Sequence, residues 1–168
     1  MNEAHFHLVF NHLPIIIPIV GILVLLSGIL LSSELMKRTA FFIFILGALG
    51  TIPAFATGEG AEEVIENIQG IDEKYIKIHE EAAETFAILS YLLGGIALIG
   101  LWANWKKMAF AKTLSLIVLV FAIAALFFAK QTGTTGGEIR HTELRADFNG
   151  TTTSSNKVDS DYEEEEDD

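Results

Sequence analysis

Four long stretches of this chain contain no charged residue, and this pattern constrains the fold more than any other feature. The stretches cover residues 4–33, 39–58, 85–105 and 113–129. Each is about as long as a helix that crosses the hydrocarbon layer of a bilayer, which is ~30 Å thick. We therefore expect an all-α integral membrane protein that forms a four-helix bundle. The predicted spans cover about residues 13–32, 40–56, 85–105 and 113–129.

The N-terminus and the amino-acid composition limit processing and chemistry. The first residues, MNEAHFH, lack the basic region of a signal peptide, and no cleavage site of small residues follows the first apolar stretch. We therefore expect the first span to remain in the mature protein. The chain contains no cysteine, which excludes disulfides, thiolate metal sites and covalently attached c-type haem.

Lysine and arginine are concentrated in two short connections, and this predicts the orientation in the membrane. Lys37 and Arg38 lie between the first two spans, and Lys106, Lys107 and Lys112 lie between the last two. Basic connections of this kind are retained on the cytoplasmic side. The long connection between the second and third spans holds nine acidic residues and only two lysines, and no basic residue precedes the first span. We therefore expect both termini to lie outside, an N-out/C-out topology.

The long acidic connection is itself predicted to be structured. Its apolar residues Val64, Ile65 and Ile68 recur at helical spacing opposite the glutamates, which indicates a short amphipathic helix on the outer rim. We expect Gly70 to end this helix. Asp72 is then a suitable N-cap for a helix that continues into the third span.

The end of the chain differs in character from the spans. Glycines at positions 133, 136 and 137 predict a chain reversal, after which the residues EIRHTEL fold back over the outer rim. Beyond residue 144 the chain is polar and ends in an acidic run. We expect residues 145–168 to be a disordered acidic tail, because they cannot bury enough apolar surface to order themselves. Residues 1–144 form the predicted transmembrane domain.

Small residues within the spans predict that the helices pack closely, because small side chains let membrane helices approach one another. These residues are Gly21, Gly28, Gly47, Gly50, Ser90, Gly95 and Gly100.

Every histidine of the chain falls on the predicted outer side. The five are His5, His7, His12, His79 and His141. A neutral imidazole binds zinc, copper and iron, and helical bundles hold cofactors with side chains from facing helices. We interpret His12 and His79 as candidate axial ligands of a haem b. The alternatives are that they share a metal with His7 and His141, or that imidazoles merely suit a membrane interface.

Spacing restricts these assignments. In an unbroken helix His5 and His12 share a face, whereas His7 points about 140° away from His12. The three converge only if the segment before Pro14 is not helical, a conformation that proline favours in the residue preceding it.

Several familiar sites are excluded by single residues. The sequence HEEAAE at His79 lacks the second histidine of the zincin motif, because position 83 is alanine. Ile76 stands where the Glu-x-x-His pair of a di-iron site needs glutamate. The spans contain no ionisable residue, which disfavours a transporter or channel.

Four segments in order, HLVFNHLPI, ATGEGAEEVIE, KYIKIHEEAAE and GGEIRHTEL, are similar to motifs of one family. This family comprises small bacterial inner-membrane proteins with four helices, known as a domain of unknown function. The resemblance covers residues 4–144 and implies a location in the bacterial inner membrane. It also implies an association with redox proteins, because the domain is sometimes joined to cytochrome c-type modules. The positions that match the family's motifs are His7, His12, His79, Gly58, Glu59, Ala61 and Gly137.

These observations lead to one functional hypothesis and two alternatives. We expect a redox-associated subunit, not an enzyme by itself, that binds haem b or a transition metal, with Tyr91 and Trp102 as candidates to line the cofactor. The first alternative is a non-catalytic anchor or assembly subunit that binds a cytochrome-type or other periplasmic partner. The second is a small-cation transporter. The lipid bilayer is an expected partner, a homo-oligomer is an open alternative, and nucleic acid is not expected.

Overall fold

The structure is a computed structural model that describes residues 2–68 and 71–146, and all regular structure in these residues is helical. The elements are α1 (Glu3–Phe10), α2 (Leu13–Leu30), α3 (Glu34–Ala56), α4 (Gly58–Glu66), α5 (Glu73–Trp105), α6 (Ala111–Arg140) and the 3-10 turn η1 (Thr142–Leu144). The predicted tail beyond residue 146 and the predicted helix end at Gly70 lie outside the described residues.

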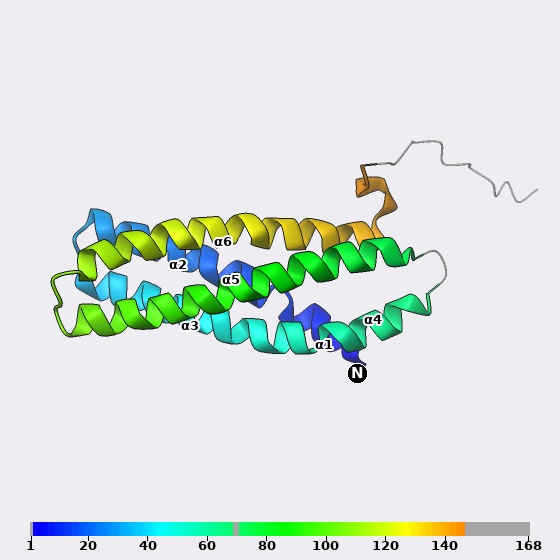
Figure 1. The fold of residues 1–168 in the computed structure, drawn as a ribbon, viewed down its shortest axis with the longest axis horizontal. Helices are drawn as coiled ribbons and strands as arrows, with labels where there is room; N and C mark the ends of the chain where they lie inside the picture. Colours follow the sequence, from blue (N-terminus) through cyan, green and yellow to red (C-terminus); the bar gives the residue numbers. More distant parts are fainter. Residues whose placement is uncertain (1, 69–70, 147–168) are drawn as a thin grey trace, which may run out of the picture.

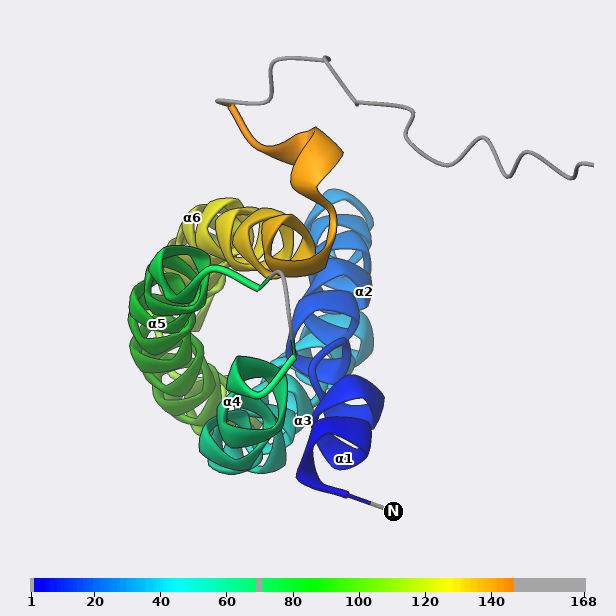
Figure 2. The same cartoon turned by 90° about the vertical axis from the view of Figure 1, so that its right-hand side faces the viewer.

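The long helices α2, α3, α5 and α6 run side by side as a bundle (Figure 1). Viewed along the bundle, they surround one axis in the order α2, α3, α5, α6, so that each contacts its two neighbours (Figure 2). Four helical segments, which contain α2, α3, α5 and α6, are long and apolar enough to cross a membrane, and this confirms the four predicted spans by length and composition. The protein is thus an all-helical chain with the features of a multi-pass membrane protein.

The centre of the bundle is packed by a few large side chains and many small ones. Leu25, Phe41, Phe44 and Val118 are inaccessible to solvent and meet alanines from α3, α5 and α6. Apolar side chains such as Leu23, by contrast, point outward. This distribution suits a lipid environment, because the hydrocarbon around a membrane bundle is as apolar as its interior.

One end of the bundle carries additional structure, and we call it the histidine end because it holds His7, His79 and His141. Here α1 packs against α4 and α3, and α4 follows α3 after the single residue Thr57. The predicted amphipathic rim helix is present as α4, with Ala61 buried and Glu63 exposed, but it begins at Gly58 and ends at Glu66. Ile68, predicted for its apolar face, lies beyond the helix and is exposed.

Helix α5 begins as predicted, because the Asp72 side chain accepts a hydrogen bond of 2.9 Å from the Lys74 backbone N–H. With 33 residues it is about 50 Å long, which exceeds the ~30 Å hydrocarbon layer. Its first turns, including His79, therefore extend beyond a span of ordinary length.

The expected chain reversal at glycines 133, 136 and 137 is wrong, because α6 continues through all three to Arg140. A glycine costs about 1 kcal/mol relative to alanine inside a helix, and contacts with α5 offset this cost. The Thr132 hydroxyl donates a 3.0 Å hydrogen bond to the Ala82 carbonyl. One turn beyond the glycines, Ile139 joins a buried cluster with Tyr75 and Ile76 of α5.

The opposite end of the bundle, which we call the lysine end, holds Lys37, Lys106 and Lys107. A polar network here joins α3 to α5: Glu34 accepts from Lys37 at 2.8 Å and also from the Asn104 side-chain amide. Arg38 Nε donates to Asn104 Oδ1 at 2.5 Å. The Lys37 side chain is buried, and its pairing with Glu34 compensates the cost of burying its charge.

Candidate functional site

His7 is held at the histidine end by a hydrogen bond to the end of α3. Its Nδ1 lies 3.0 Å from the Ala54 carbonyl oxygen and 3.4 Å from the Thr57 hydroxyl. The ring lies on helix α1, whose N-terminus is capped by Asn2: the Asn2 side chain accepts a hydrogen bond of 3.0 Å from the His5 backbone N–H. The helix is interrupted at residues 11–12, which separates α1 from α2, and α1 packs against α4.

His79 is held by α6 in the same manner. Its Nδ1 lies 3.1 Å from the Thr132 carbonyl oxygen and 3.2 Å from the Thr135 hydroxyl. Gly136 packs directly on the ring, since a Cβ atom at this position would lie only 3.0 Å from His79 Cε1. The glycine therefore provides the space that the imidazole occupies.

These contacts fix the tautomer of both rings. A carbonyl oxygen only accepts hydrogen bonds, so Nδ1 of each neutral imidazole carries the proton and donates it to the backbone. Nε2 then keeps its lone pair. Histidines that ligate metals have this arrangement, in which the second ring N–H is donated to a carbonyl or carboxylate that orients the ring.

The two oriented imidazoles lie at the same end of the bundle. His7 and His79 are each half-buried, and the pKa of the His79 imidazole is lowered by its burial and, to a smaller extent, by the charge of His7. One ring comes from α1 and the other from α5, while α3 and α6 supply the orienting carbonyls. The histidine end thus holds two oriented side chains that are 72 positions apart in the sequence.

The other histidines lie apart from this pair. His5 and His12 are exposed, with His12 at the start of α2. His141 is also exposed, and its Nδ1 lies 2.9 Å from Glu143 Oε1. The Glu143 backbone N–H and the His141 ring together hold the pKa of the Glu143 carboxyl below its usual value. Of the four predicted ligands, the structure therefore holds His7 and His79 half-buried at one end of the bundle, and it leaves His12 and His141 at the surface.

Asn11 is a further polar group in this region. It follows His7 by one turn of α1, and its backbone N–H donates to the His7 carbonyl at 2.8 Å. Its Oδ1 atom is buried and has no hydrogen-bond partner within residues 2–68 and 71–146. An orphaned buried acceptor costs about 1–3 kcal/mol, so its presence favours a bound group that donates to it.

Some of these partners are invisible to motif reasoning, because Ala54 and Thr132 contribute only backbone carbonyls. The sequence did contain a signal for the Thr132 contact with His79. Thr132, Thr135 and Gly136 have i, i+3, i+4 spacing, which places them on one helix face if the segment is helical. In the described part of the chain, no three histidine or acidic side chains converge to hold an ion. Nε2 of His7 and Nε2 of His79 are thus the candidate ligand atoms at this end.

The motif residues on which the family resemblance depends also gather at the histidine end. Gly58, Glu59 and Ala61 belong to α4, and a Cβ atom on Gly58 would lie 3.9 Å from His7 Cε1. Gly137 follows Gly136 on α6. The resemblance itself stays a prediction. No family model, no curated protein and no solved structure matches this chain.

Proposed function

We propose that this protein is a redox-associated subunit of the bacterial inner membrane that binds a transition-metal centre through Nε2 of His7 and Nε2 of His79. The observation that carries the proposal is the pair of Nδ1 hydrogen bonds to the Ala54 and Thr132 carbonyls. These bonds orient the two rings and leave both lone pairs available.

The donor set selects the kind of metal centre. Two neutral imidazoles suit copper, zinc and iron rather than calcium or magnesium, which prefer oxygen ligands. A haem b would likewise be held by these two histidines. A bound iron or copper centre would supply one-electron chemistry. The chain's own residues orient the ligands through backbone carbonyls, and the buried Asn11 Oδ1 offers an acceptor to a group at the centre.

The test is an absorption spectrum and a metal analysis of the detergent-purified full chain, taken from cells supplied with iron and copper. We expect a Soret band for haem, or a stoichiometric metal ion without one. Either signal should disappear in His7→Ala and in His79→Ala. The matched controls are His5→Ala, on the same helix as His7, and His141→Ala, because both rings are exposed.

His12→Ala separates the two candidate ligand pairs. If His7 and His79 hold the centre, His12→Ala retains at least most of the signal. Loss in His12→Ala with retention in His7→Ala would replace our pair by His12 and His79. A colourless and metal-free wild-type protein would reject the function.

A second candidate, an anchor or assembly subunit with a periplasmic partner, is favoured by the exposed carboxylates of the rim. Glu59, Glu63 and Glu66 of α4 are exposed, as are Glu80 and Glu84 of α5. A basic partner surface would complement them. Cross-linking from Glu63→Cys should then recover one dominant partner, and the alanine variants of His7 and His79 should leave this product unchanged.

A further inference from the structure

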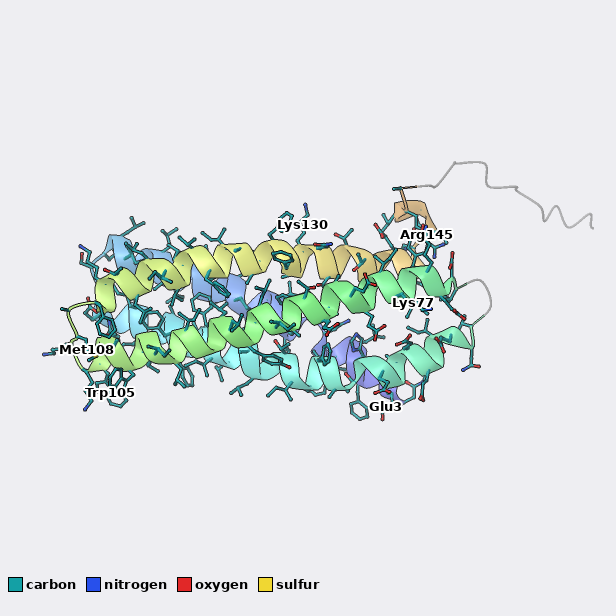
Figure 3. All side chains as sticks on the ribbon, viewed as in Figure 1. Glu3, Lys77, Trp105, Met108, Lys130 and Arg145 are labelled. Carbon is teal, nitrogen blue, oxygen red and sulfur yellow. The ribbon has the colours of Figure 1, made fainter. Side chains whose placement is uncertain are left out.

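Two tryptophans and a lysine form a hollow at the lysine end. Trp102, Trp105 and Lys106 line a space of about 440 Å³ where α5 ends. Trp102 is 51% exposed and Trp105 is 72% exposed. Figure 3 shows Trp105 at the tip of the bundle, beside the turn that carries Met108. Tryptophan is enriched where a membrane protein crosses the level of the lipid headgroups, so the hollow opens at that level.

The turn after the hollow is held in a defined conformation. The Lys106 backbone N–H donates to the Trp102 carbonyl at 3.0 Å, and the Met108 N–H donates to the Ala103 carbonyl at 3.0 Å. Lys107 has a φ of 54°, in the left-handed region. These backbone bonds end α5 and fix the backbone of Lys106 next to that of the two tryptophans.

The charge at this end is uncompensated. Lys37 is paired with Glu34, and Arg38 is bound by the neutral Asn104 side chain. Lys106, Lys107 and Lys112 form no ion pair with any described residue. An anion beside Lys106 would therefore meet a surplus of positive charge.

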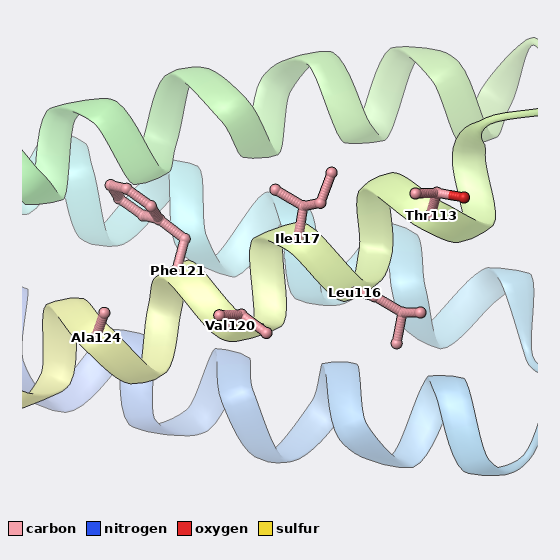
Figure 4. A pocket seen from close by; sticks show the side chains of 6 residues that line it. All are labelled: Thr113, Leu116, Ile117, Val120, Phe121 and Ala124. Atoms are coloured by element: carbon pink, nitrogen blue, oxygen red, sulfur yellow. The ribbon is translucent and has the colours of Figure 1, made fainter.

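An apolar groove on α6 begins at the same end. Thr113, Leu116, Ile117, Val120, Phe121 and Ala124 line it (Figure 4). All except Thr113 are hydrocarbon in character, and the groove follows α6 away from the lysine end. It therefore offers an acyl chain an apolar path in the direction of the membrane centre.

We propose that the hollow formed by Trp102, Trp105 and Lys106 binds the headgroup of an anionic phospholipid, whose phosphate pairs with the Lys106 ammonium. Basic sites at membrane helix ends recognise anionic headgroups in this way. The phosphate satisfies the lysine charge, the indoles contact the glycerol region, and the acyl chains lie on the apolar surface of the bundle. This site is independent of the histidine pair.

The chain provides its own probe, because Trp102 and Trp105 are its only two tryptophans. The experiment measures quenching of tryptophan emission in the detergent-purified full chain by brominated phosphatidylglycerol, and by brominated phosphatidylcholine with the same acyl chains. We expect phosphatidylglycerol to bind about fivefold more tightly, the ratio that one lysine near a membrane surface supplies. Lys106→Gln should bring this ratio close to one.

Lys112→Gln is the matched control, since it removes the same charge from the same end outside the hollow and should retain the preference. Equal quenching by the two lipids in the wild type would overturn the proposal. So would an equal loss in Lys112→Gln and Lys106→Gln, which would indicate diffuse attraction. Inorganic phosphate, compared with chloride at equal ionic strength, should not displace the lipid, and displacement would identify a site for free phosphate instead.

Discussion

Gly94 and Gly95 are adjacent residues of α5 that face opposite environments. A Cβ atom on Gly94 would lie 2.5 Å from the Ala48 Cβ, so the absence of a side chain sets the distance between α5 and α3 at this level. A Cβ atom on Gly95 would have nothing within 4 Å in the described chain. One glycine is therefore required by packing, and its neighbour is not.

Gly94→Ala should destabilise the bundle, because the new methyl group forces α3 and α5 apart. We expect a loss of about 1–3 kcal/mol in the free energy of unfolding, the usual cost of overpacking. Gly95→Ala should change this free energy by less than about 0.5 kcal/mol, as exposed substitutions do. Reversible unfolding of both variants in mixed micelles tests the difference. Equal effects would show that the α3–α5 contact is looser than described.

The same residue scale shows how far sequence reasoning reaches. The order of residues along the chain places small residues in the spans and all five histidines at one end. It does not show how each helix is rotated about its axis, and therefore which residues face its neighbours. For this reason Gly95 was a candidate for close packing, although Gly94 makes the contact. Likewise, its position near the span favours His12 as a ligand, and only the structure shows that His12 is exposed whereas His7 is half-buried and bonded to the Ala54 carbonyl.

Among the elements, the C-terminal end of α6 is held by the side chain of Arg145, a residue that lies beyond the helix. Arg145, which follows η1, places its guanidinium 3.9 Å from the centre of the Tyr75 ring at the start of α5, a cation–π contact. The same side chain donates to the Glu138 carbonyl at 2.9 Å and to the Ile139 carbonyl at 3.2 Å. It thereby satisfies two carbonyls that a helix end leaves without partners.

Arg145→Ala should therefore loosen the end of α6 without unfolding the bundle. The lost cation–π contact and hydrogen bonds together contribute about 1–2 kcal/mol, which raises local opening about 5–30-fold. Hydrogen exchange of residues 71–76 and 137–145 measures this opening. Arg140→Ala removes the same charge from the exposed last residue of α6 and serves as the control. Equal exchange in both variants would contradict the assignment.

Helix α6 also shows why element boundaries escape sequence reasoning. Three glycines within five residues favour a turn by local preference, yet they lie inside a helix whose neighbour supplies the stabilisation. His79 occupies the space above Gly136, and Ile139 reaches the buried cluster with Tyr75. Where a helix end depends on a local bond alone, as at Asp72, the prediction is confirmed. The difference is whether the deciding contact is local or distant.

At the scale of the whole molecule, the two ends of the bundle have opposite charge. The lysine end carries five basic side chains and one acidic one: Lys37, Arg38, Lys106, Lys107, Lys112 and Glu34. The remaining described residues include twelve acidic and five basic side chains. Because the chain crosses the bundle an even number of times, the start of α1 and the end of α6 lie at the same, acidic end (Figure 1). The N-out/C-out orientation stays a prediction, and it depends on the lysines and the arginine in the two short connections at the lysine end.

Orientation can be tested in the absence of competing thiols, because the chain has no cysteine. We expect Glu63→Cys, on the exposed face of α4, to react with a membrane-impermeant maleimide in bacterial spheroplasts. Lys112→Cys, exposed at the lysine end, should react only after the membrane is permeabilised. The reverse pattern would place the histidine pair in the cytoplasm and exclude a periplasmic redox partner for it. Replacing Lys37, Arg38, Lys106 and Lys107 by glutamine should remove most of the bias and produce mixed labelling, because positive charge in the short connections is what retains them inside.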